Sequence, residues 1–145
     1  MNSPTRRTRP ILVVENDPNT IRSFSNFFRG FPLSFASSVS SALEELHLSP
    51  IHIIIANENI PQGDGIALLE TARHYLPQVI RVLMGNEKPP LLPQMMWAGI
   101  IDHFLQKPLS PTSCSKLLDI IHYQPYNSRQ SERNRMKKIS VYGPH

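Results

Sequence analysis

Ile51-His-Ile-Ile-Ile-Ala-Asn-Glu-Asn-Ile-Pro-Gln-Gly-Asp-Gly65 is the stretch of sequence that decides the fold. It opens with an isoleucine-rich run, 51–55, and ends in turn residues. A run this short and apolar predicts a β-strand buried on both faces, which requires helices on both sides of the sheet. Asn57 lies just past the end of this predicted strand. Ligands and reactive groups of α/β sheets gather at that end, so an amide occupies the position best placed for chemistry.

Apolar runs and helical periodicities alternate along the rest of the chain. A helix is predicted after Asp17 and Pro18, which suit the N-cap and first helical position, and it ends at Gly30. Prolines at 89, 90 and 93 let the fourth helix begin no earlier than about Leu91. The other predicted strands are 11–14, 33–36, 79–84 and 100–105, and the other predicted helices follow Ser38 or Ser40, Asp64 and Ser110.

Five strand–helix units predict an α/β fold with a doubly wound parallel sheet. The flavodoxin-like (βα)5 arrangement, with strand order 2-1-3-4-5, is the usual outcome for such units. We expect the first, third and fifth strands to lie together at the sheet centre. The groups that follow them, Glu15 with Asn16, Asn57 and Lys107, should then converge at one rim of the sheet.

Composition divides the chain into a domain and two basic ends. Residues 11–123 carry seven basic and ten acidic side chains, so the net charge of +4 comes from the ends. We predict a flexible basic arm at 1–9, a domain at 10–123 and a basic, disordered tail at 124–145. The one cysteine, Cys114, excludes an internal disulfide and suits a cytoplasmic, reducing location. No apolar run approaches the roughly 18 residues of a membrane span, so no membrane insertion is expected.

Four motifs in consistent order resemble a response-regulator receiver domain of the CheY-like family over about residues 9–123. Ile11-Leu-Val-Val-Glu-Asn-Asp-Pro18 is similar to the family's first strand and acidic pair, and Ser37-Ser-Val-Ser-Ser-Ala-Leu43 to the entry to its second helix. The segment Asn57–Gly65 resembles the phosphoacceptor loop, and Phe104-Leu-Gln-Lys-Pro108 resembles the fifth-strand signature.

The resemblance implies a site that has lost most of its chemistry. Such domains accept a phosphoryl group from a phosphohistidine on an aspartate, with a divalent cation neutralising the transferring oxygens. Asn57 stands at the phosphoacceptor position, and the acidic pair is Glu15 with Asn16. Gly85 replaces the family's serine or threonine. Lys107 and the aromatic switch residue Phe104 keep the family's residue types.

These departures predict a pseudo-receiver, which is not an enzyme and regulates a partner by protein–protein contact without phosphorylation. With one carboxylate left of three, Mg²⁺ binding is expected to be weak or absent, and no other cofactor is predicted. A histidine kinase or another regulator is the expected protein partner. Receivers often use the face formed by helix 4, strand 5 and helix 5, where Met95, Met96 and Trp97 are a candidate contact surface or core residues.

Two alternative functions remain open from the sequence. A conventional phosphoacceptor regulator would use a non-standard carboxylate, Asp17 or Glu58. A nucleic-acid-associated regulator would use the basic tail at 124–145, whose arginines and lysines suit phosphate contacts. The six histidines form no metal-binding spacing, and His103 is the one placed to act as a pH-sensitive group.

Overall fold

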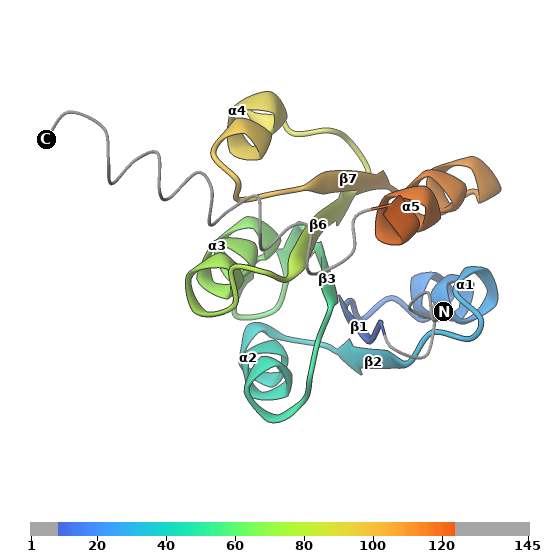
Figure 1. Ribbon diagram of the computed structural model, residues 1–145, viewed down its shortest axis with the longest axis horizontal. Helices are drawn as coiled ribbons and strands as arrows, with labels where there is room; N and C mark the ends of the chain where they lie inside the picture. Colours follow the sequence, from blue (N-terminus) through green and yellow to red (C-terminus); the bar gives the residue numbers. More distant parts are fainter. Residues whose placement is uncertain (1–8, 124–145) are drawn as a thin grey trace, which may run out of the picture.

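The computed structural model describes residues 9–123, without the side chain of Tyr123, and its helices and strands alternate along this segment (Figure 1). Residues 1–8 of the predicted arm and the whole predicted tail, 124–145, lie outside the described residues. The elements are β1 (Ile11–Val14), α1 (Pro18–Phe27), β2 (Leu33–Ala36), α2 (Val39–Leu48), β3 (Ile53–Asn57), β4 (Asn59–Ile60), β5 (Gly63–Asp64), α3 (Gly65–Tyr75), β6 (Ile80–Gly85), α4 (Leu92–Trp97), β7 (His103–Gln106) and α5 (Pro111–Tyr123).

The main sheet has the order β2-β1-β3-β6-β7, and all four strand pairings in it are parallel. This confirms the predicted flavodoxin-like fold and strand order, since β6 and β7 are the fourth and fifth long strands. Our expectation that the fifth strand lies at the sheet centre is wrong, because β7 pairs only with β6 and forms an edge. Lys107 must therefore reach past the end of β6 to meet groups on β1 and β3.

Helices cover both faces of the sheet, as the apolar strands require (Figure 1). Alternate strand residues point to opposite faces: Ile53 and Ile55 of β3 pack with α1 and α5, whereas Ile54 and Ala56 pack with α2 and α3. The first core contains Phe24, Phe28 and Leu117, and the second contains Ala42, Leu68 and Leu69. A two-faced core fixes the strand register, because a shift of one residue would exchange the two sets of side chains.

Three strands differ in their limits from the prediction. Strand β3 runs from Ile53 to Asn57 instead of 51–55, so Asn57 is its last residue and not a residue past its end. Strand β6 spans Ile80–Gly85, one residue later than expected. Strand β7 begins at His103 rather than Ile100. The cause of the later start is Arg81, whose buried guanidinium donates hydrogen bonds to the carbonyls of Gly99 and Ile100 and holds them in a turn.

A short antiparallel hairpin, β4–β5, follows β3 and was not predicted. Its turn residue Gln62 has φ 74° and accepts a hydrogen bond from the backbone of Ser40, which ties the hairpin to α2. The next residue after the hairpin, Gly65, donates its backbone N–H to the carbonyl of Glu58. A Cβ on Gly65 would lie 2.1 Å from the carbonyl oxygen of Asn57, so only glycine fits between α3 and the end of β3.

Arg9 corrects the expected limit of the N-terminal arm. It is 3% exposed, and its guanidinium donates a hydrogen bond to the carbonyl oxygen of Ile121 near the end of α5. Burial lowers the pKa of Arg9. This contact joins the residue before β1 to the last helix, so Arg9 belongs with the domain. Within residues 9–123, no helix has the length and apolar character of a membrane span.

We predict that Gly65→Ala lowers the free energy of unfolding by about 2–3 kcal/mol, because overpacking against a backbone carbonyl forces the chain to shift. Urea unfolding of the full chain, followed by circular dichroism, measures the loss. Gly63→Ala is the matched control, since its Cβ would meet only the Val39 side chain, at 3.1 Å. Equal stabilities of the two variants would contradict the prediction.

Candidate functional site

Glu15, directly after β1, has a carboxylate that is saturated with hydrogen bonds. The residue is 2% exposed. Its Oε2 accepts the backbone N–H groups of Asn16 and Asp17, each at 3.0 Å. Its Oε1 accepts the side chains of Asn57 and Lys107. A carboxylate offers about four acceptor positions, so each is taken by a donor of the protein itself.

Asn57 connects this carboxylate to the loop that follows β3. Its Nδ2 donates to Glu15 Oε1 at 2.8 Å, and its Oδ1 accepts the backbone N–H of Asn59 at 3.2 Å. The two roles need an amide, since one end donates and the other accepts. A carboxylate at this position would only accept, and it would face the Glu15 carboxylate at hydrogen-bond distance.

Lys107 follows the edge strand β7 and supplies the positive charge of the site. Its Nζ lies 2.9 Å from Glu15 Oε1. The lysine side chain is 15% exposed and that of Glu15 is 1% exposed, so this ion pair is largely removed from water. The backbone N–H of Lys107 donates to the carbonyl of Gly85, at the end of β6. Strand pairing therefore places the lysine where it can reach across β6.

Gly85 has no side chain, and the side chains of Glu58 and Phe104 lie close to the space beside it. A Cβ built on this buried glycine would lie 3.1 Å from Glu58 Oε1 and 3.7 Å from Cε1 of Phe104. Glu58 thus turns its carboxylate toward the end of β6, a position that sequence analysis did not foresee. Phe104 is half-buried and packs against the core shared with α2 and α3. An open pocket of about 480 Å³ is lined by Asn57, Glu58, Gly85 and Lys107, among others.

The side chains of Asn16 and Asp17, which follow Glu15 in the sequence, lie outside the Glu15 cluster. Asn16 is exposed. Asp17 caps α1, where its carboxylate accepts the hydroxyl of Thr20 at 2.8 Å and the backbone N–H groups of Asn19 and Thr20. The Thr20 hydroxyl is the largest cause of the lowered pKa of Asp17. Asp17 is therefore committed to the helix start.

The site brings together three of the predicted residues, Glu15, Asn57 and Lys107, in one hydrogen-bonded cluster. Gly85 and Glu58 line the adjoining pocket and Phe104 lies beside Gly85, whereas Asn16 is exposed and Asp17 caps α1. Among residues 9–123, no group of three or more histidine, cysteine, aspartate or glutamate side chains is placed to hold a metal ion. The chemistry available to the cluster is hydrogen bonding and charge pairing.

Comparison with known proteins agrees with this architecture. The family model of the response regulator receiver domain matches residues 11–119. A CheY-like receiver domain protein of Methanospirillum hungatei JF-1 has 19% identity and a TM-score of 0.71, over 86% of this chain and 98% of that one. The signal receiver domain of an HD domain-containing protein from Pseudomonas fluorescens Pf-5 has 26% identity and a TM-score of 0.73, over 93% and 98%. No curated protein sequence matches the chain.

We predict that Lys107→Met lowers the free energy of unfolding by about 2 kcal/mol, because it leaves the buried Glu15 carboxylate without its cationic partner. Thermal and urea unfolding at neutral pH measure the effect. The control is Lys88→Met, the same change at an exposed lysine, which should alter stability by less than about 0.5 kcal/mol. A Lys107→Met variant as stable as the control would show that the ion pair contributes little.

Proposed function

The chain belongs to the response regulator receiver family, whose domains act in two-component signal transduction through protein partners, and from that premise we propose that it is a pseudo-receiver. It accepts no phosphoryl group and has no enzymatic activity of its own. It regulates a protein partner by contact in the cytoplasm. A histidine kinase or an effector of the same signalling system is the class of partner that the family supplies.

The observation that carries this proposal is the bond network around Glu15. The residue that ends β3 is Asn57, an amide, and its nitrogen already donates to Glu15 Oε1 at 2.8 Å. A carboxamide is neutral and its electrons are delocalised, so it is a very poor nucleophile toward phosphorus. The Lys107 ammonium is likewise engaged by Glu15, which holds all three groups in a single arrangement.

The same network argues against a bound divalent cation. Hard cations such as Mg²⁺ need anionic or carbonyl oxygens with free lone pairs. The Glu15 oxygens are occupied by four donors, and the Lys107 ammonium stands beside Oε1. A cation bound by both Glu15 oxygens would have to displace the lysine and three N–H donors, so the residues of this site do not fit Mg²⁺.

The alternative carboxylates fit phosphotransfer less well than the pseudo-receiver proposal. Asp17 has its oxygens bonded at the start of α1. Glu58 lies near Gly85, but it follows the strand-end position instead of occupying it. The nucleic-acid alternative rests on the tail at 124–145, which lies outside the described residues.

The protein contact is proposed on the face formed by α4, β7 and α5. Trp97 is 93% exposed and Met96 is 43% exposed, so two of the three residues singled out on α4 are available to a partner. Met95, the third, packs against the core shared with α2 and α3. An exposed tryptophan is a common anchor of protein interfaces.

We predict that incubation of the full chain with acetyl phosphate and Mg²⁺ leaves its intact mass unchanged, because no carboxylate stands in the attacking position. Mass spectrometry under conditions that preserve acyl phosphates tests this, with a conventional receiver domain as the positive control. A phosphoryl adduct that survives in an Asn57→Ala variant would point to another acceptor and overturn the proposal.

We predict that Asn57→Asp gains only partial Mg²⁺ binding, because Asn16 and Gly85 still depart from the family's pattern. Without the cation, this variant should be less stable than the parent chain, since two carboxylates would face each other at hydrogen-bond distance. Isothermal titration with Mg²⁺ and thermal unfolding measure both effects. Asn59→Asp, at the exposed first residue of β4, is the charge-matched control. Metal affinity equal to that of an intact receiver would contradict the prediction.

A further inference from the structure

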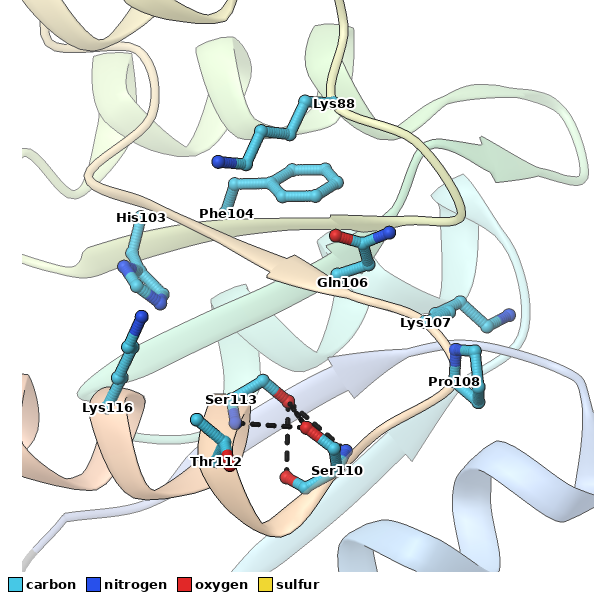
Figure 2. Close-up of a pocket in the computed structure, with 10 residues that line it drawn as sticks. All are labelled: Lys88, His103, Phe104, Gln106, Lys107, Pro108, Ser110, Thr112, Ser113 and Lys116. Carbon is cyan, nitrogen blue, oxygen red and sulfur yellow. Dashed lines mark hydrogen bonds between the residues drawn. The ribbon is translucent and has the colours of Figure 1, made fainter.

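A groove between β7 and α5 gathers positive charge. Its volume is about 440 Å³, and its lining includes Lys88, His103, Lys107 and Lys116 (Figure 2). Serine, threonine and glutamine side chains and the faces of Phe104 and Pro108 complete it. No aspartate or glutamate is among the described residues that line it. We refer to this hollow as the β7–α5 groove.

His103 lies between two of the lysines. Figure 2 shows the Lys116 ammonium directed toward its ring from α5, and Lys88 on the opposite side of the groove. The imidazole is half-buried at the start of β7. Burial is the largest cause of its lowered pKa, and repulsion by Lys116 and Lys88 lowers the pKa further. Lys88, His103 and Lys116 thus line one groove, and no acidic side chain of the described residues lines it with them.

In the pocket beside the Glu15 cluster, acidic side chains balance the lysines. It shares Lys88 and Lys107 with the groove, but Glu58 and Glu87 line it as well. An anion that approaches this end of the sheet is repelled by those two carboxylates. The β7–α5 groove offers the same lysines from the other side without that repulsion, so it is where an anionic group gains most from the local field.

We propose that the β7–α5 groove docks an acidic segment of a protein partner, with a carboxylate of that segment between Lys88 and Lys116 and beside His103. The inference rests on the proposed function, a protein-contact receiver, and specifies the chemistry of its partner. It places the contact at the β7–α5 groove within the broader α4–β7–α5 face.

The size and lining of the groove favour a polypeptide over a nucleic acid. Its volume suits a few side chains, and the Phe104 ring and Pro108 can cover the methylene groups of glutamate. A nucleic-acid backbone needs cations in a long row.

Docking of a carboxylate in this groove is coupled to protonation of His103. Lys116 of α5 and Lys88 of the segment after β6 are the charged groups that act on His103, and both disfavour the imidazolium. A docked carboxylate offsets their repulsion and favours the charged ring. The pKa of His103 therefore rises in the complex, binding takes up a proton, and affinity increases as pH falls through the range between the two pKa values.

The full chain, labelled with ¹⁵N, is to be titrated with a short glutamate-rich peptide, its lysine-rich counterpart and a single-stranded oligonucleotide. We expect the acidic peptide to shift the amide signals of residues 103–106 and 113–116. Lys88→Glu combined with Lys116→Glu should weaken its binding roughly tenfold or more. The α1 control carries the same charge change at Arg22 on α1 and at Arg29 in the turn after it, Arg22→Glu combined with Arg29→Glu, and should keep the groove shifts.

A pH series tests the proton coupling. From about pH 7.5 to 5.5 the affinity of the acidic peptide should increase several-fold in the parent chain, and by at most about tenfold per pH unit for one proton. His103→Gln should bind with nearly constant affinity over this range. Thermal unfolding of each variant confirms that it is folded before its affinity is compared.

Four results would overturn the inference: peptide shifts confined to the basic ends, equal weakening by the groove and α1 variants, groove shifts caused by the oligonucleotide but not by the peptide, or pH-independent binding by the parent chain. Each of these leaves the phosphorylation test unaffected. A phosphoryl adduct would instead overturn the proposed function, while the charge and lining of the groove would remain open to the same titration.

Discussion

The buried carboxylate of Glu15 determines how the rim of this sheet is organised. A charge at 2% exposure is tolerated only when opposite charge and hydrogen bonds compensate the lost hydration. Two backbone N–H groups, an amide and an ammonium provide that compensation from β1, β3 and the end of β7. Because the donors come from strands that are distant in sequence, the network also locks the carboxyl ends of those strands together.

The sequence was sufficient for the fold because its signals are local. Short apolar runs such as Ile53–Asn57 and Ile11–Val14 predict buried strands, and Asp17, Asp64 and Ser110 mark helix starts through their own side chains. The expected convergence of Glu15, Asn57 and Lys107 assumed a central fifth strand, whereas Lys107 reaches Glu15 from the edge strand β7. The late start of β7 could not be read this way, because the Arg81 guanidinium that holds the carbonyls of Gly99 and Ile100 acts across 18 to 19 residues.

The same limit applies to surface features. Lys88, His103 and Lys116 lie on a loop, a strand and a helix, and no spacing rule connects them. Only the packing of α5 against β7 brings their charges to one groove. The two hollows at this end of the molecule share Lys88 and Lys107 but differ in charge balance, since Glu58 and Glu87 line one of them alone. Sequence motifs identify residues by type, whereas an electrostatic field depends on where all the charged side chains lie in the folded chain.

Gly85 limits which substitutions the site can accept. The space that its missing side chain leaves is approached by Glu58 Oε1, 3.1 Å from where a Cβ would stand. A hydroxyl-bearing residue at position 85 would have to displace that carboxylate, and an aspartate at position 57 would face the carboxylate of Glu15. Each substitution therefore requires its acidic neighbour, Glu58 or Glu15, to move.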